Sequence, residues 1–103
     1  MGRVLLSDVL ESWELYELDD SIYVSEGVEL SLTSEVSIMP FDRTRKRIVG
    51  DQCYLLGIEQ IRDVVEGLKA QLGRTTTLVE RLRAVVHFTR YDAFINPRDA
   101  VGN

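Results

Sequence analysis

The sequence contains a single cysteine and a single histidine among its 103 residues. One cysteine excludes an internal disulfide and is typical of a protein in a reducing compartment. Together the two residues cannot supply the four ligands of a structural zinc site within one copy of the chain. The chain also lacks a secretory-signal pattern and any apolar run near the roughly 18 residues of a transmembrane helix. We therefore expect a cytoplasmic protein with no membrane association, no metal and no cofactor.

The common catalytic motifs are missing as well. There is no glycine-rich phosphate loop, no aspartate-rich calcium loop and no serine elbow. His87 is expected at the surface among charged residues, and Cys53 lies in an apolar stretch where cysteine usually acts as a small buried side chain. His87 lacks a serine or cysteine in reach, and Cys53 has the negative Asp51 nearby, although the arginine-rich loop could fold back and supply the positive charge that a reactive thiolate needs. We predict a non-enzymatic protein with no catalytic residues.

Charge is distributed unevenly along the chain, whose net charge is −5. Residues 1–42 contain ten acidic residues and one basic residue, whereas residues 43–103 contain seven acidic and eleven basic residues. An acidic surface repels nucleic acid and attracts basic protein surfaces. The basic run from Arg43 to Arg47 could bind phosphate, but no aromatic residues accompany it. We therefore expect a protein partner rather than a nucleic acid.

Period-two hydrophobicity is the most regular pattern in the sequence. From Ile22 to Ile38 the apolar residues occupy even positions, which predicts antiparallel strands with one face on a core. Turns are predicted at Glu26-Gly27 and at Thr33-Ser34-Glu35, although one long strand bent around Gly27 fits the same pattern. A further short strand is predicted from Cys53 to Leu56.

Helical spacing predicts three helices. The first is short, begins with Ser7 as its N-cap and ends near Trp13 to Tyr16. The second covers residues 58–72, whose apolar residues share one face. The third follows the capping box Thr77-x-x-Glu80 and continues to about Arg90.

Grouped strands followed by helices predict an α+β fold. We expect a short N-terminal helix, an antiparallel sheet of three or four strands, and two C-terminal helices packed on one sheet face. Residues 1–96 should form a single α+β domain, and residues 97–103 a loose C-terminal tail. A chain of this length has little stability to spare, so a homodimer is also compatible with the sequence.

Three carboxylates lie on the polar face of the predicted helix 58–72, namely Glu59, Asp63 and Glu66. Such groups could hold a divalent cation or form an acid/base pair if they lined a concave site. However, Arg62 and Lys69 are spaced to pair with Glu66, which is typical of a solvated helix face. An enzyme that uses these carboxylates is therefore the third of three functional alternatives.

Three segments of the sequence carry a resemblance: Trp13-Glu14-Leu15-Tyr16, then Ile58 to Glu66 with its Ile-x-Asp-Val-Val-Glu core, then Tyr91-Asp92-Ala93-Phe94-Ile95. Read together, they resemble an uncharacterised family of small bacterial domains of unknown function, over nearly the whole chain. The resemblance implies no catalytic residues. It implies the context of small acidic accessory proteins, including immunity-type proteins, in mobile or variable bacterial loci.

The leading hypothesis is a protein-interaction domain, such as an immunity-type protein that binds a basic toxin through an acidic face. The candidate contact residues are Trp13, Glu14, Tyr16, Glu17, Asp19 and Asp20. The alternative is a small-molecule-binding domain with a pocket between sheet and helices. Five aromatic residues could also line a small-ligand pocket between the first and last helices, although core packing is their more usual role: Trp13, Tyr16, Phe88, Tyr91 and Phe94.

Overall fold

The computed structural model describes residues 3–25, 27, 29–40, 48–49 and 52–101, with the backbone alone at 48, 49 and 97. Glu26 and the Arg43–Arg47 run lie outside the described residues. The elements in chain order are β1 (Arg3–Leu5), α1 (Leu6–Glu11), the 3-10 helix η1 (Trp13–Leu15), β2 (Ser21–Ser25), β3 (Glu35–Met39), β4 (Ile48–Val49), β5 (Gln52–Gly57), α2 (Ile58–Leu72), α3 (Leu78–Tyr91) and α4 (Pro97–Val101).

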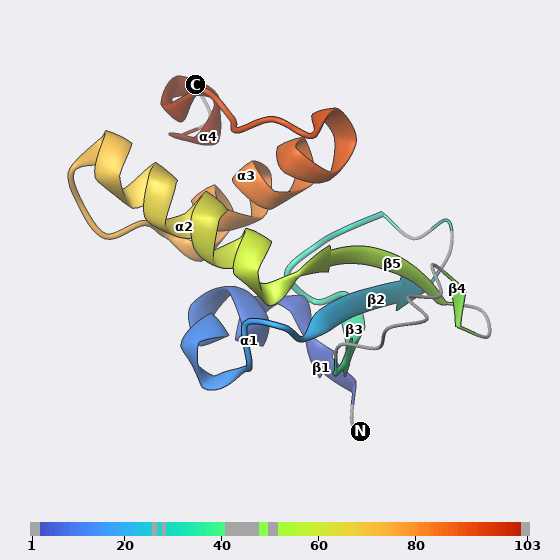
Figure 1. Ribbon diagram of the computed structural model, residues 1–103. Coiled ribbons are helices and arrows are strands. Elements are labelled where there is room, and N and C mark those ends of the chain that lie inside the picture. Colours follow the sequence, from blue (N-terminus) through green and yellow to red (C-terminus); the bar gives the residue numbers. More distant parts are fainter. Residues whose placement is uncertain (1–2, 26, 28, 41–47, 50–51, 102–103) are drawn as a thin grey trace.

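The strands form one antiparallel sheet in the order β1-β3-β2-β5-β4. Helices α2, α3 and α4 gather on one side of it (Figure 1). The predicted α+β class and antiparallel sheet are confirmed. The described part of the chain has five strands because β1 and β4, of three and two residues, lie at the two edges of the sheet.

A β-bulge interrupts the pairing of β2 with β5. Ile22 pairs with Leu56, but Tyr23 pairs with Tyr54, so Leu55 is the extra residue on β5. A bulge lets consecutive side chains deviate from strict alternation. Leu55 and Leu56 therefore both reach the core, while Tyr23 and Tyr54 meet edge-to-face with ring centroids 5.8 Å apart.

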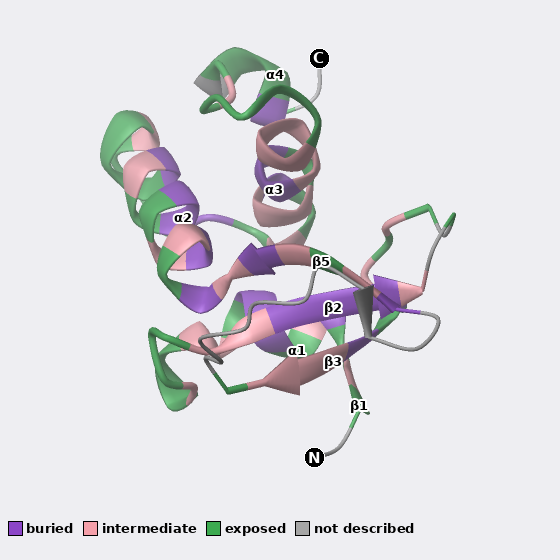
Figure 2. Cartoon of the chain, turned by 45° about the vertical axis from the view of Figure 1, so that its right-hand side comes forward, coloured by how far each residue is buried: buried purple, intermediate pink, exposed green. Residues whose placement is uncertain are grey.

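The hydrophobic core lies where the helices meet the sheet, as the purple segments of Figure 2 show. Helix α2 covers the predicted residues and buries the predicted apolar face. Helix α3 begins with the predicted capping box: Thr77 Oγ1 accepts from Glu80 N at 3.2 Å, and Glu80 Oε1 accepts from Thr77 N at 2.9 Å. The fully buried larger side chains are Leu6, Val9, Leu10, Ile22, Val36, Leu56, Ile58, Ile61 and Val85.

The N-terminal helix is present, but the predicted Ser7 cap is wrong. Helix α1 starts at Leu6, and no side chain caps it. Leu6 N donates to Ser34 O at 2.8 Å, and Ser7 N donates to Leu32 O at 3.0 Å. Backbone carbonyls therefore satisfy the first amide groups of the helix, which removes the need for a side-chain cap.

The segment that supplies these carbonyls was predicted as a strand and is a loop. Ser34 N donates to Ser31 O at 3.1 Å, which places the turn at residues 31–34 rather than 33–35. Ser31 N also donates to Ser34 Oγ at 2.9 Å. Such serine bonds give the backbone an alternative to ladder pairing. Leu30 and Leu32 still pack against the core, so their periodic spacing correctly indicates partial burial without a strand.

The predicted loose tail is also corrected. Residues 97–101 form helix α4, in which Ala100 is completely buried. Arg83 Nη1 donates to Ala100 O at 3.1 Å, and α4 contacts both α2 and α3.

None of the helices in the described part of the chain has the length and apolar composition needed to cross a membrane.

Candidate functional site

The predicted contact residues lie in residues 11–20, which we call the acidic segment. Successive tight turns shape it, because Tyr16 N donates to Trp13 O at 3.2 Å and Asp20 N donates to Glu17 O at 3.0 Å. A 3-10 helix has three residues per turn, so Trp13 and Tyr16 share one face. Both are half-buried and pack against the core. The side chains between them consequently face outward.

The acidic segment is fixed to the start of α2. Ile58 N donates to Asp20 O at 2.9 Å, and Glu59 N donates to Leu18 O at 3.2 Å. Glu17 N also donates to Asp20 Oδ2 at 3.2 Å, which closes the last turn. The first amide groups of a helix need such partners, so the acidic segment and α2 stabilise each other.

The carboxylates of the acidic segment are not neutralised locally. Glu11, Glu14, Glu17 and Asp19 are exposed, and none forms an ion pair with any residue that the structure describes. Asp20 differs, since it is half-buried and accepts the hydrogen bond from Glu17 N. The segment therefore presents a negative surface on a backbone held by hydrogen bonds.

Sequence reasoning missed the most exposed large apolar side chain of this segment. Leu15 is 84% exposed and Leu18 is 40% exposed. Trp13 and Tyr16, which the sequence suggested as partner contacts, are half-buried and pack against the core. The three-residue spacing of Trp13 and Tyr16 is the sequence signal for the inward face of a 3-10 turn. Leu15 does not share that spacing, so it lies outside that face.

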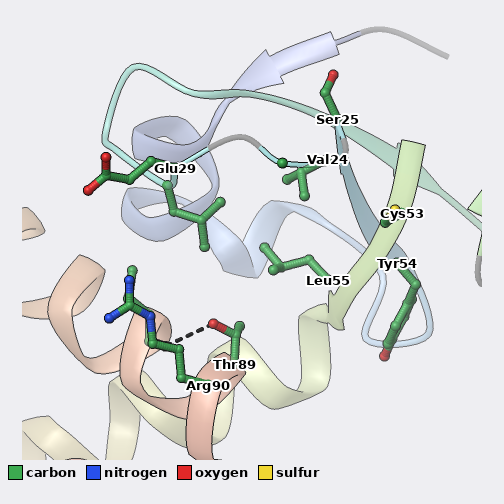
Figure 3. A pocket seen from close by; sticks show the side chains of 11 residues that line it. Val24, Ser25, Glu29, Cys53, Tyr54, Leu55, Thr89 and Arg90 are labelled. Atoms are coloured by element: carbon green, nitrogen blue, oxygen red, sulfur yellow. Dashed lines mark hydrogen bonds between the residues drawn. The ribbon is translucent and has the colours of Figure 1, made fainter. Parts of the chain in front are cut away.

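A cavity of about 360 Å³ lies between the sheet, the segment around Leu30 and the end of α3 (Figure 3). Its apolar wall comes from Val24, Leu30, Leu55 and Val86. Cys53, predicted as a small buried side chain, is half-buried on the cavity wall.

Polar groups line the rest of this cavity. Figure 3 shows Glu29 and Arg90 on one side of it, away from Cys53 and Tyr54. Thr89 also lines it and donates its hydroxyl to Val86 O at 2.8 Å. Among the described residues that line it, the cavity therefore combines an apolar wall with the carboxylate of Glu29 and the guanidinium of Arg90.

The aromatic residues near the end of α3 do not line this cavity. Phe88 and Phe94 pack with ring centroids 5.8 Å apart, and His87 contacts Tyr91 at 4.8 Å. His87 is half-buried rather than exposed as predicted. Tyr91 and Phe94 are exposed. These side chains pack in two pairs near the end of α3 and are not part of the wall of this cavity.

The carboxylates of α2 lie on an exposed helix face, as predicted for a solvated surface. Arg62 bonds Asp63 at 3.0 Å and approaches Glu59 at 3.6 Å, so the predicted pairs of Arg62 and Lys69 with Glu66 are not formed. Within the part of the chain that the structure describes, no three acidic, cysteine or histidine side chains come together as metal ligands would.

Among the titratable groups that the structure describes, a helix-capping carboxylate has a strongly lowered pKa. Hydrogen bonds from Arg74, followed by the one from Thr77 N, lower the pKa of Glu80 to about 2. The side chain of Glu80 is nearly buried and completes the capping box of α3. The Glu80 carboxylate therefore has a structural role, which is to cap α3 and bind Arg74.

These features define a small α+β domain whose described residues include an acidic segment and a partly polar cavity. The chain belongs to the family described as a domain of unknown function (DUF7716), whose model matches residues 3–97. The resemblance seen from Trp13 to Ile95 is thereby confirmed. Comparisons with curated proteins and with solved structures find no significant match.

Proposed function

We propose that the protein is a non-enzymatic interaction domain that binds a basic protein surface through its acidic segment. The observation that carries the proposal is the exposure of Leu15 beside carboxylates that have no ion pair among the described residues. An exposed apolar side chain within a charged rim is a common arrangement at protein interfaces. Leu15 would be the central contact, with Glu14 and Glu17 at the rim.

The physical contributions of the two kinds of residue differ. Burying an exposed leucine on a partner stabilises a complex by about 1.5–3 kcal/mol. Carboxylates at the rim mainly accelerate encounter with a basic surface and disfavour acidic partners. The hydrogen bonds of Leu18 O and Asp20 O to α2 hold the segment in place before binding, which lowers the ordering cost of association.

The finer form of the proposal is an immunity-type protein of a bacterium. The partner would be a toxin with a basic active site, such as a nuclease, that is blocked when the acidic segment covers it. The concentration of acidic residues in the first 42 positions supports this form. The partner remains defined by its chemistry, a basic concave protein surface.

The test compares two double charge reversals that change the net charge equally. Glu14→Lys with Glu17→Lys alters the acidic segment but keeps Asp20, whose carboxylate bonds Glu17 N. Glu66→Lys with Asp99→Lys is the matched control, because both residues are exposed and lie on α2 and α4. Partners captured from the native host by the wild-type protein are identified, and their association rates are measured against salt concentration.

The segment variant should associate at least about tenfold more slowly at low salt, and the difference should shrink as salt screens the charges. The control variant should behave as wild type. Equal rates for both variants, or an acidic partner surface, would contradict the proposal. If the partner is harmless when expressed alone, the immunity form fails while the interaction itself remains.

A further inference from the structure

The cavity beside α3 is independent of the acidic segment and has its own chemistry. The β-bulge turns Leu55 toward the same side as Val24, and Val86 of α3 completes an apolar wall with Leu30. A volume of about 360 Å³ lies near the lower end of the range of about 300–1,000 Å³ that is typical of ligand pockets. A cavity of this size can hold a molecule as large as one apolar amino acid.

Two opposite charges lie at one side of this cavity. Glu29 and Arg90 are both exposed, and neither forms an ion pair with any described residue. Figure 3 shows them on the same side of the cavity, with Leu55 between this side and Cys53. A ligand that carries both charges could pair with each of them and still place an apolar group against the wall.

We propose that the cavity binds a free apolar α-amino acid. Arg90 would receive the α-carboxylate, since a guanidinium donates two parallel hydrogen bonds to that group. Glu29 would accept from the α-ammonium. Val24, Leu55 and Val86 would contact the apolar side chain, and Thr89 Oγ1, which already donates to Val86 O, could accept one further hydrogen bond.

The chain offers a built-in reporter for this site. Cys53 is the one cysteine of the sequence and lies on the cavity wall. Its thiolate attacks an aromatic disulfide reagent, which forms a mixed disulfide and releases one coloured aryl thiolate. A bound amino acid would slow this reaction, so the rate of colour release measures occupancy.

The probes are leucine and phenylalanine, together with two fragments of phenylalanine. Phenethylamine keeps the ammonium and the ring, whereas hydrocinnamate keeps the carboxylate and the ring. We expect phenylalanine to protect Cys53 at a concentration at least about tenfold lower than either fragment does, because only phenylalanine pairs with both charges. Amide proton–nitrogen NMR spectra of the same samples follow residues 24, 30, 55 and 86.

Matched variants test the contributions of Arg90 and Glu29 to binding separately. Arg90→Gln should weaken protection by phenylalanine and by hydrocinnamate, and Glu29→Gln should weaken protection by phenylalanine and by phenethylamine, each by about tenfold. Arg98→Gln and Asp99→Asn remove the same charges from exposed positions on α4 and should leave protection unchanged. Thermal unfolding of all four variants verifies that they fold.

Three results would overturn the proposal. The first is an unchanged Cys53 rate together with unchanged NMR spectra at up to about 10 mM of each amino acid, a concentration that detects millimolar affinity. The second is a fragment that protects as well as phenylalanine. The third is equal protection in Arg90→Gln and Arg98→Gln. Should Cys53 react too slowly to measure, the NMR shifts decide, and none of these outcomes bears on the acidic segment.

Discussion

Arg74 donates from both terminal nitrogens to the two carboxylate oxygens of Glu80, at 2.9 and 2.6 Å. Oε1 of the same carboxylate accepts from Thr77 N, which is the N-cap residue of α3. Arg74 Nη1 also donates to Thr75 O at 3.0 Å. One nearly buried carboxylate thus connects the loop after α2 to the first turn of α3, and the bidentate bond from Arg74 requires its ionised form.

This arrangement predicts that the wild-type protein loses stability in acid and that the Glu80→Gln variant lacks this part of the pH dependence. The pKa of Glu80 is lowered from 4.5 to about 2 by the bonds from Arg74 and Thr77. Because folding lowers this pKa, ionised Glu80 stabilises the folded protein. The stabilisation is fully present above pH 4.5, the pKa in the unfolded chain, and is lost as the pH falls toward 2. The wild-type protein should therefore unfold at higher urea concentration than Glu80→Gln at pH 7, with the difference shrinking between pH 4.5 and 2.

Glu66→Gln is the control for this titration, because Glu66 is exposed and has no ion pair among the described residues. Its unfolding midpoint should follow that of the wild-type protein at every pH. A wild-type advantage over Glu80→Gln that stays constant from pH 5 to pH 2.5 would show that the bidentate pair does not stabilise the fold.

Alanine substitutions at Gly67, inside α2, and at Gly73, its C-cap, should change the free energy of unfolding in opposite directions. Gly67 lies inside the helix with open space where the methyl group of an alanine would lie, so Gly67→Ala should raise the free energy of unfolding by about 0.5–1 kcal/mol. Gly73 ends the helix at φ +69°, where an alanine is strained, so Gly73→Ala should lower it by about 1–2 kcal/mol. Urea unfolding of both variants measures the pair, and a common sign would contradict the helix end at Gly73.

Much of this fold follows from local sequence signals. The helix 58–72 is predictable because its apolar residues share one face and Gly73 follows it. The capping box of α3 is equally local. The α1 cap is not predictable in this way, since its partners Leu32 O and Ser34 O come from a segment more than twenty positions away. The bulge at Leu55 depends on pairing with β2 in the same manner.

The candidate site shows the same division. The exposed carboxylates Glu14 and Glu17 follow from composition, because unpaired acidic side chains favour water. The inward packing of Trp13 depends on α2 and the core, which the sequence of the segment does not contain. The cavity unites residues of β2, the loop after it, β5 and α3, so Glu29 and Arg90 line the same cavity only through tertiary structure.

A core leucine and a surface leucine should respond differently to truncation. Leu56 is 1% exposed within the core, and Leu56→Ala should lower the free energy of unfolding by about 2–5 kcal/mol. Leu15 is 84% exposed, so Leu15→Ala should change it by less than about 0.5 kcal/mol. Chemical unfolding of both variants checks this expectation. A large loss in Leu15→Ala would mean that this residue serves the fold, and its exposure could not then be attributed to a partner.

The family match ends at residue 97, at the start of helix α4. We nevertheless expect α4 to contribute to the stability of the domain. Ala100→Asp would place a carboxylate in a completely buried position, so α4 should detach from α2 and α3 at a cost of about 1–3 kcal/mol. Val101→Asp alters the neighbouring residue, which is 41% exposed, and should change the free energy of unfolding by less than about 0.5 kcal/mol. Urea unfolding with amide hydrogen exchange at residues 97–101 compares the two. A loose tail would make both variants equal to wild type, because neither carboxylate would then be transferred from water into the core.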